Sequence, residues 1–340
     1  MDRYHRQILL PQIGKTGQEK LSQARVLLIG CGALGTVLAD QLTRAGVGFL
    51  RIVDRDLVEL TNLQRQVLFD ESDASQNLPK AIAAGNRLRA VNSSISIEPV
   101  VANVDASNVE EFAKDVDLML DGTDNVATRY LLNDVAVKHK INWIYGAAVA
   151  MEGRVMAVLP GTTPCLRCVF PEPPTPGELP TCDTAGVLGP VSTMVASLQA
   201  IAAIKLLTQQ ENAIANELLT LDLWSNRIRS IPLEGERRSD CVSCGLHRYE
   251  FLEARTDSAT SLCGRDAIQI RAGKHHLDLD ELQRQLERNG QVTRTPYFLR
   301  IRLADPREIE LTVFPDGRTI VRGTTDAGRA RAIFSRFVGD

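Results

Sequence analysis

The stretch Leu27–Gln66, LLIGCGALGTVLADQLTRAGVGFLRIVDRDLVELTNLQRQ, decides the fold of this chain. It begins with an apolar run of strand length, followed by the glycine-rich sequence GCGALG and an amphipathic segment of helix length. Gly30, Gly32 and Gly35 let the backbone turn tightly, approach a phosphate and pack the following helix, whose N-terminus carries partial positive charge. Asp54 ends the next apolar run, 19 residues after Gly35, where a carboxylate can accept hydrogen bonds from a ribose. The stretch therefore predicts a nucleotide-binding unit.

The same alternation continues to about residue 160. Strands are expected at 25–30, 49–54, 95–104 and 117–123, helices at 34–46, 78–92 and 125–140, and two strands joined by a turn within 142–160. Strands that alternate with helices predict an α/β fold with a doubly wound, mostly parallel sheet. Ligands of such sheets bind beyond the carboxyl ends of the strands.

Two domains are expected, at residues 1–250 and 256–340. The expected order of elements in the second domain is strand, helix, strand, strand, turn, strand and helix, which predicts a small α+β domain. Within the first domain, the proline-rich segment Pro171–Pro190 has little reason to be regular, and it is a candidate mobile loop.

Composition narrows the function classes. The formal charge is -3 and the pI is near 6.0. Nucleic acid and anionic membranes bind to clustered positive charge, which this composition does not indicate, so neither is an expected partner. The apolar segment Leu188–Leu207 contains Ser, Thr, Gln and Lys, and is expected to be a buried or interface helix rather than a membrane span. The N-terminal apolar run, Ile8–Leu10, is too short for a signal peptide, which favours a cytoplasmic location.

Charged side chains past the ends of the expected strands distinguish two uses of a nucleotide. Asn62 and Arg65 follow the second strand, Lys80 opens the next helix, and Asp121 and Asp124 follow a later strand. A hydride-transfer enzyme binds its pyrophosphate largely through backbone amides. Cleavage of ATP at the α-phosphate instead builds charge on the departing pyrophosphate, which Arg, Lys and a carboxylate-held Mg²⁺ stabilise. Singly, each cation is more often a solvated surface charge, so the joint arrangement carries the prediction of ATP cleavage.

Four of the seven cysteines form two CxxC pairs, Cys165 with Cys168 and Cys241 with Cys244, and 72 residues separate the pairs. Each pair can give two thiolates to one tetrahedral Zn²⁺, and a closed four-sulfur site is structural rather than catalytic. Separate redox motifs or unpaired thiols are the alternatives.

The other three cysteines are weighed singly. Cys182 lies in the proline-rich segment, close to the N-terminus of a helix expected from about Gly189, where a thiolate is stabilised and can act as a nucleophile. On composition alone, however, a lone loop cysteine is more often inert. Cys31 is expected to pack under the glycine loop, and Cys263 has no identifiable partner.

The motifs RYHRQ, GCGALG, VDRDLVELTNLQRQ, LPKA, DGTDN, the two CxxC pairs and CDTAGVLGP, in this order, resemble one family. It is the ThiF/MoeB/HesA family of E1-like adenylyltransferases, which activate ubiquitin-like sulfur carriers for thiamine and molybdenum cofactor biosynthesis. The resemblance covers about Tyr4 to Gly245. It implies that the C-terminal Gly-Gly carboxylate of a carrier attacks the α-phosphate of Mg-ATP, giving an acyl-adenylate and pyrophosphate. A sulfur donor, such as a cysteine desulfurase or a rhodanese, would later form the thiocarboxylate.

The resemblance also assigns roles to residues. Asp54 would hold the ribose, Asn62, Arg65 and Lys80 would contact the phosphates, and Asp124, beside Asn125, would hold Mg²⁺. Arg6 would reach the triphosphate of a neighbouring subunit, which makes a homodimer part of the mechanism, and Cys182 would take the acyl group or a sulfur-transfer intermediate. The implied nucleotide-binding set is Gly30, Gly32, Ala33, Gly35, Asp54, Thr61, Asn62, Leu63, Gln64, Arg65, Lys80, Asp124 and Asn125. The implied catalytic set is Arg6, Arg65, Lys80, Asp124 and Cys182.

Two features depart from the family pattern. Ala33 stands where the family commonly has a glycine, a change of one methyl group in a loop that is otherwise intact. The C-terminal domain does not resemble the rhodanese domain that some relatives append, and the residues around Cys263 lack the spacing of a persulfide loop. We expect this domain to bind the carrier or to pack in a dimer.

Three other functions are compatible with part of these motifs. An NAD-dependent oxidoreductase would explain the glycine loop and Asp54, but neither His139 nor His5 offers it a convincing acid or base. A non-catalytic scaffold would have no use for Arg65, Lys80 and Asp124. A dehydratase that adenylates a tRNA base on the same fold would explain ATP cleavage, but it would not need the zinc pairs or Cys182.

Overall fold

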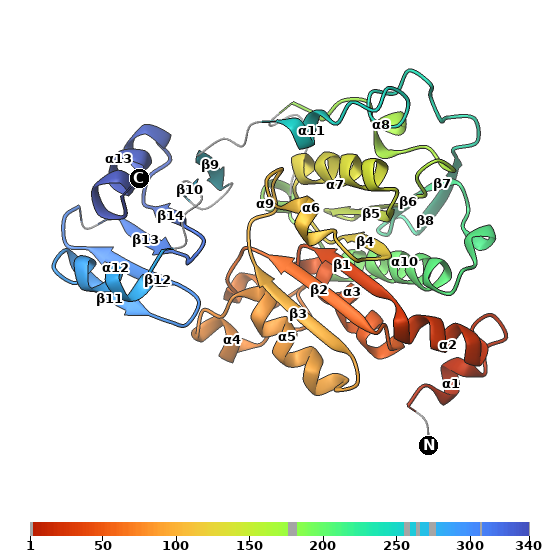
Figure 1. The fold of residues 1–340 in the computed structure, drawn as a ribbon, viewed down its shortest axis with the longest axis horizontal. Helices are drawn as coiled ribbons and strands as arrows, with labels where there is room; N and C mark the ends of the chain where they lie inside the picture. Colours follow the sequence, from red (N-terminus) through yellow and green to blue (C-terminus); the bar gives the residue numbers. More distant parts are fainter. Residues whose placement is uncertain are drawn as a thin grey trace. The chain divides into compact units, whose positions relative to one another are not determined.

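The computed structural model describes residues 3–175, 182–254, 259–262, 266–271, 277–306 and 308–339, with only the backbone of residues 182, 183 and 259–262. The chain folds into two compact units, Met1–Ala254 and Arg255–Asp340 (Figure 1).

The first unit is built on an eight-stranded sheet in the order β3-β2-β1-β4-β5-β6-β7-β8. The strands are β1 (Arg25–Ile29), β2 (Phe49–Asp54), β3 (Ser96–Val101), β4 (Leu118–Asp121), β5 (Asn142–Val149), β6 (Glu152–Val158), β7 (Glu217–Asp222) and β8 (Arg227–Pro232). Neighbours from β3 to β5 pair in parallel, and the pairs from β5 to β8 are antiparallel. The predicted doubly wound, mostly parallel sheet is confirmed.

The central strand shows why the sheet is covered on both faces. Val26 and Leu28 of β1 belong to one apolar core, whereas Leu27 and Ile29 belong to a second core on the opposite face. Because successive side chains of a strand point to opposite faces, an unbroken apolar run needs helices on both sides.

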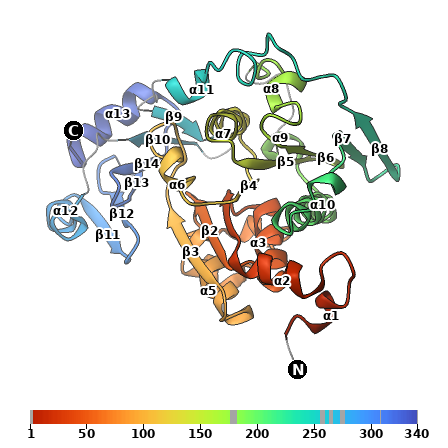
Figure 2. The same ribbon diagram turned by 45° about the vertical axis from the view of Figure 1, so that its right-hand side comes forward.

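Helices supply those two layers (Figures 1 and 2). The first core takes side chains from α2 (Gly14–Gln23), α3 (Ala33–Ala45), α5 (Lys80–Val91) and α10 (Gly189–Leu207). The second takes them from α6 (Val109–Phe112), α7 (Val126–His139), α8 (Leu166–Val169) and α11 (Glu250–Glu253). The shorter elements are α1 (His5–Ile8), α4 (Glu71–Ser75), α9 (Cys182–Ala185) and the 3₁₀ turns η1 (Leu60–Asn62) and η2 (Glu211–Ala213).

Helix α10 is the one helix in the described part of the chain that is long and apolar enough to cross a membrane. It packs against α3, β5 and β6, and half of its most apolar window is buried inside the first unit. Gln199 on this helix donates hydrogen bonds to the carbonyl oxygens of Asp121 (2.9 Å) and Ile144 (3.3 Å). Such packing is typical of a core helix in a globular unit.

The second unit holds a six-stranded antiparallel sheet in the order β11-β12-β13-β14-β10-β9. Its elements are β9 (Ala259–Leu262), β10 (Ala267–Arg271), α12 (Leu279–Leu286), β11 (Gly290–Arg294), β12 (Leu299–Leu303), β13 (Glu310–Val313), β14 (Arg318–Arg322) and α13 (Ala327–Phe337). Leu282 of α12 and Ile333 of α13 share one core with Ile301 of β12 and Val321 of β14. The predicted small α+β unit is therefore present.

Some elements were not predicted. No clear sequence pattern indicates β7, β8, β9 or β11, and β8 is exposed along its whole length. β8 is the last strand of its sheet and carries Arg227, Arg229 and Pro232. The predicted mobile loop, Pro171–Pro190, falls partly outside the described residues; its described part includes the single helical turn α9.

We predict that Gly35→Ala destabilises the first unit by about 1–3 kcal/mol, because overpacking forces the backbone to shift. A Cβ at Gly35 would lie 1.9 Å from the carbonyl oxygen of Gly30. Calorimetric melting measures the effect. Gly328→Ala in α13 is the matched control, because its nearest atom would be a side-chain oxygen of Asp326 at 3.2 Å. Equal melting of the first unit in both variants would contradict the close approach.

Candidate functional site

Gly30 and Gly122 bring two loops together at the carboxyl edge of the parallel strands. Gly30 has φ +87°, a left-handed conformation that favours glycine, and its amide donates to the carbonyl oxygen of Val53 (2.9 Å). A Cβ on Gly30 would lie 2.7 Å from the carbonyl group of Gly122, in the loop after β4. A Cβ on Gly122 would in turn lie 2.4 Å from the carbonyl oxygen of Gly30. The β1–α3 turn and the β4–α7 loop are therefore in direct backbone contact, and α3 begins directly after Gly32 at Ala33.

Asp54, at the end of β2, fixes the shape of the glycine turn. One carboxylate oxygen accepts from the amide of Cys31 (2.6 Å) and the other from the amide of Asp56 (2.7 Å). Burial raises the pKa of Asp54, and the neighbouring Lys80 opposes that effect. Cys31 is fully buried beneath the turn, as the sequence suggested, and burial raises the pKa of its thiol.

Lys80 is the first residue of α5, and it points into the same edge. Lys80 is only 4% exposed, and its Nζ lies 3.3 Å from Oδ2 of Asp56. The amide of Lys80 also donates to the carbonyl oxygen of Asp56 (2.9 Å). Asp56 therefore fixes both the start of α5 and the ammonium group, a role that the sequence analysis did not assign.

The segment from Thr61 to Gln66 forms the side of the site next to β2. Asn62 is buried, and its Oδ1 accepts from the amide of Glu59 (3.1 Å). Arg65 is half-buried and donates from Nη1 to the carbonyl oxygen of Thr61 (2.8 Å). Leu63 is half-buried, whereas Thr61 and Gln64 are exposed. Buried Gln66, for which no motif in the sequence predicted a role, lies beside Gly32, and its Oε1 has no hydrogen-bond partner among the described residues. Buried polar atoms are nearly always paired, so a water molecule or a ligand is expected to complete the hydrogen bonding of this amide.

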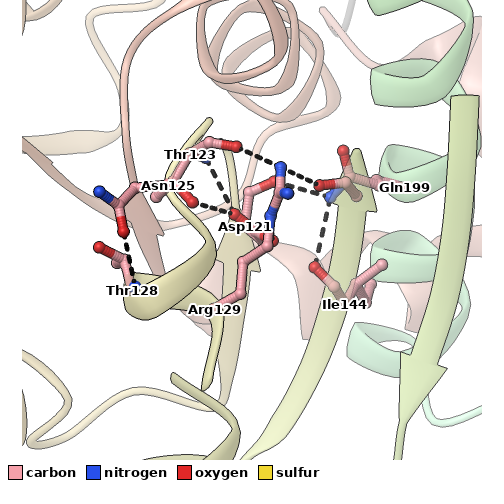
Figure 3. A network of polar contacts seen from close by, with 8 residues as sticks. Asp121, Thr123, Asn125, Thr128, Arg129, Ile144 and Gln199 are labelled. Atoms are coloured by element: carbon pink, nitrogen blue, oxygen red, sulfur yellow. Dashed lines mark hydrogen bonds and ion pairs between the residues drawn. The ribbon is translucent and has the colours of Figure 1, made fainter. Parts of the chain in front are cut away.

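A buried ion pair organises the loop after β4 (Figure 3). Nε of Arg129 lies 3.2 Å from Oδ2 of Asp121, which is fully buried, and Nη2 of Arg129 donates to the carbonyl oxygen of Thr123 (2.7 Å). Oδ1 of Asp121 accepts from both the amide and the hydroxyl of Thr123. Burial raises the pKa of Asp121, and the Arg129 guanidinium opposes that effect. Asp121 is therefore a structural group, engaged on both oxygens.

Asp124 and Asn125 follow this loop and are both exposed at the carboxyl edge. Asn125 caps α7, because its Oδ1 accepts from the amide of Thr128 (3.0 Å; Figure 3). Asp124 follows directly on Thr123, which Asp121 and Arg129 hold. The carboxylate of Asp124 is thus carried on a fixed backbone and faces solvent, as a metal ligand at an open site must.

The N-terminus of α10 packs against the same segment that carries Arg65. A Cβ on Gly189 would lie 3.1 Å from the carbonyl oxygen of Gln64. These segments line a hollow of about 460 Å³, together with Val67, Pro190, Thr193 and Met194. The residues just before α10 are anchored to the end of β5, because Ala150 pairs with Gly186 and Leu188 through backbone hydrogen bonds. The backbone of α9, which begins at Cys182, also lies next to β5; the side chain of Cys182 lies outside the described residues.

Arg6 lies at the opposite end of the first unit from the glycine turn. The arm that carries it is fixed by Tyr4, whose hydroxyl accepts from Asn92 (2.8 Å) and whose ring lies against Gly46. Gly46 caps the far end of α3, a 13-residue helix that spans about 20 Å from the glycine turn. Arg6 is exposed and is not brought together with the other predicted site residues of its own chain.

The two CxxC pairs meet as one buried cluster, although 72 residues separate them in the chain. The sulfur atoms lie 3.6 Å apart for Cys165 and Cys241, 3.4 Å for Cys168 and Cys244, and 3.9 Å for Cys165 and Cys168. A tetrahedral zinc site with bonds of about 2.3 Å places its sulfurs about 3.8 Å apart. The four free thiols therefore fit the ligand set of a closed metal site.

The fold and this geometry define a class of protein: an E1-like α/β enzyme with cationic and acidic groups around a glycine turn. Comparison with known proteins gives the family. Residues 4–243 match the model of the ThiF family, and the chain belongs to that family of E1-like adenylyltransferases.

Similarity to one curated relative extends along the whole chain, and similarity to others extends along most of it. The sulfur carrier protein ThiS adenylyltransferase of Bacillus subtilis is 41% identical over 340 residues, which cover 99% of both chains. The sulfur carrier protein adenylyltransferase of Thermus thermophilus is 39% identical over 250 residues, or 72% of this chain and 91% of its own. Among solved structures, E. coli MccB with AMPCPP and MccA is 25% identical, with a TM-score of 0.63, over 72% of this chain and 74% of its own.

We predict that Arg129→Met destabilises the first unit by about 3–5 kcal/mol, because it leaves the buried carboxylate of Asp121 without its counter-ion. Calorimetric or denaturant unfolding measures the loss. The double variant Asp121→Asn/Arg129→Met removes both charges and should recover a large part of the stability. A double variant as unstable as the sum of the two single variants would show that the two groups act independently.

Proposed function

We propose that this chain adenylylates the C-terminal Gly-Gly carboxylate of a ubiquitin-like sulfur carrier with ATP. A carboxylate oxygen of the carrier attacks the α-phosphorus, the bond between the α- and β-phosphates breaks, and pyrophosphate leaves with the bonding electrons. The product is an acyl-adenylate, ready for conversion to a thiocarboxylate. Because the relative that matches along the whole chain is named for ThiS, we further propose a ThiS-type carrier and thiamine biosynthesis.

The joint placement of three charged groups around the glycine turn carries this proposal. Lys80 and Arg65 lie on one side of the turn, and Asp124 follows the loop that touches Gly30 on the other. Positive charge fixed in advance stabilises a pyrophosphate leaving group, and it costs no reorganisation during the reaction. A nicotinamide cofactor develops no such charge, and the relatives reported above are adenylating enzymes. Both points favour carrier adenylylation over an oxidoreductase or a tRNA-base dehydratase.

Roles follow from position. The amides of the turn at Gly30, Gly32, Ala33 and Gly35, with the N-terminus of α3, would face the nucleotide phosphates. Asp54 holds the turn through two amides, and its remaining lone pairs would accept from the ribose hydroxyls. Asn62, Arg65 and Lys80, with Thr61, Leu63 and Gln64 beside them, would line the triphosphate.

Asp124, beside Asn125, would hold Mg²⁺, since one or two carboxylates plus substrate phosphates are the usual ligands of that ion. When bound, Mg²⁺ neutralises phosphate charge. The exposed carboxylate of Asp124 on a fixed loop fits this need.

Cys165, Cys168, Cys241 and Cys244 would bind one structural Zn²⁺. The observed sulfur separations support this assignment, and the buried position leaves no open coordination site for catalysis. The ion would join the segment before Pro171–Pro190 to the end of the first unit.

Cys182 would act after adenylation. Its thiolate would either displace AMP from the acyl-adenylate and form a thioester with the carrier, or take the outer sulfur of a persulfide on a donor, such as a cysteine desulfurase or a rhodanese, whose thiolate leaves. The backbone of α9 lies by β5, on the carboxyl side of the sheet, which supports a place near the activated carbonyl. We propose carrier binding or dimer packing for the second unit, and a cytoplasmic location for the chain.

We predict that the wild-type chain exchanges labelled pyrophosphate into ATP only when carrier is present, and that Asp124→Ala lowers the rate by about 10²-fold or more. Mass spectrometry of the carrier should show an added AMP. Glu19→Ala, an exposed change in α2, is the matched control. Exchange that survives in Asp124→Ala would remove the metal role; absence of exchange with every Gly-Gly carrier of the source organism would remove the function.

The homodimer proposal predicts complementation. Arg6→Ala and Lys80→Met chains should each be inactive alone, because every site then lacks one cation. When the two variants are mixed one to one, half of the dimers are hybrids. Each hybrid has one intact site, built from Lys80 of one chain and Arg6 of the other. About a quarter of wild-type exchange activity should return. Failure of the mixture to regain activity, while both chains dimerise, would contradict a shared site.

A further inference from the structure

Helix α7 carries a row of polar side chains that runs from the nucleotide edge to the cysteine cluster. Asn125 caps the helix, Arg129 lies one turn further, and Asn133 another turn beyond. Residues four apart lie on the same face of a helix, and four residues advance about 6 Å along its axis. Eight consecutive residues of the helix, Tyr130–Val137, are buried. The row is therefore mounted on a rigid element.

The first part of the row holds the loop that carries Asp124. Arg129 contacts Asp121 and the carbonyl oxygen of Thr123 (Figure 3). It also donates to the carbonyl oxygen of Gly146 at 3.3 Å. A shift of α7 along its axis would lengthen these bonds. The position of the β4–α7 loop thus depends on the position of the helix.

The second part of the row holds both CxxC loops. Oδ1 of Asn133 accepts from the amide of Leu166, inside the first CxxC (2.8 Å), and its Nδ2 donates to Oγ of Ser243, inside the second (3.1 Å). Ser243 then donates to Oδ1 of Asp134 (2.9 Å), whose Oδ2 accepts from the amide of Phe251 in α11 (3.0 Å).

These side chains have no access to water. Asn133, Asp134 and Ser243 are each 0% exposed, and their side-chain polar atoms take part in the bonds just described. A buried polar network in which every member is satisfied fixes one arrangement of the groups around it, since loss of any member leaves a costly unpaired atom. The network therefore sets where the two pairs of thiols point.

We propose that Asn133, Asp134 and Ser243 are positioning residues of the cysteine-cluster metal site, and that α7 couples metal binding there to nucleotide binding at the sheet edge. The inference rests on the proposed zinc site and ATP site. A metal that fixes the CxxC loops fixes α7 through Asn133 and Asp134, and α7 fixes the loop of Asp124 through Arg129. Coupling of this kind is reciprocal, so ATP must tighten zinc binding by the factor by which zinc tightens ATP binding.

Wild-type chain is tested first, without carrier. Zinc content and the visible spectrum of the Co²⁺-substituted chain report the four-thiolate site, and equilibrium dialysis reports binding of a non-hydrolysable ATP analogue. A chain that binds neither zinc nor the analogue refutes the proposed function, and this inference falls with it. A chain that binds both permits the next measurement.

Competition with a chromogenic chelator then measures the zinc affinity with and without saturating analogue. We expect the analogue to tighten zinc binding about fivefold or more, which lies in the usual range of coupling factors. Circular dichroism verifies that the zinc-free chain remains folded. Equal zinc affinity in the two conditions would overturn the coupling.

Variants test the positioning role. Asn133→Ala should weaken zinc binding about 10–100-fold, as outer partners of metal ligands do, and alter the Co²⁺ spectrum. Ser243→Ala removes only a hydroxyl group. It provides the same test if Asn133→Ala fails to fold. Lys138→Ala, on an exposed part of the same helix, is the matched control, since Lys138 pairs only with Glu110 among its described contacts.

Ser243→Ala also separates the link from a general effect on folding. If α7 carries the coupling, the analogue should tighten zinc binding in this variant by a smaller factor than in wild type. An unchanged factor would mean that the nucleotide acts through overall stability, and it would overturn the role of α7. Wild-type zinc affinity in both Asn133→Ala and Ser243→Ala would overturn the positioning role.

Discussion

The backbone contact between Gly30 and Gly122 sets the distance between the two loops on which the site is built. Side chains at either position would push the loops apart, because each added Cβ would lie within 2.7 Å of the opposite backbone. The contact is possible only because β1 and β4 are adjacent parallel strands that end at the same level. Asp54 secures one of the loops and the Asp121–Arg129 pair secures the other. The backbone of these two loops therefore sets the position of side chains that face solvent, such as Asp124.

Sequence patterns predicted the first unit well wherever the pattern reflected burial. The β1, β2 and β4 strands are apolar runs between turn signals, and the glycine motif together with Asp54 located the carboxyl edge. β8 escaped prediction because its six residues are exposed, so no apolar period marks it. β11 is likewise half polar, and its core contact is made mainly by Val292.

Site residues divide in the same way. Asn62 and Arg65 lie in the segment that follows β2, and Lys80 opens α5, so the order of the elements was enough to predict that they share one edge of the sheet. Arg129 and Asn133 were not predicted as functional residues. Each is a polar residue within a helix, and such residues usually lie on a face exposed to solvent. Their burial depends on what packs over the helix, which no local pattern reveals. The position of Asp121 after a strand indicates a site residue, whereas in the structure both of its carboxylate oxygens are bonded to Arg129 and Thr123.

The exposed edge strand of the first sheet, β8, affects the solubility of the protein. β8 ends its sheet, so one row of its backbone donors and acceptors has no neighbouring strand among the described residues. Such a margin can recruit the same strand of another molecule and start an ordered aggregate. Arg227 and Arg229 would place like charges against each other in that stack, and Pro232 lacks the amide needed to extend it. The strand thus carries its own barrier to fibril growth at high concentration.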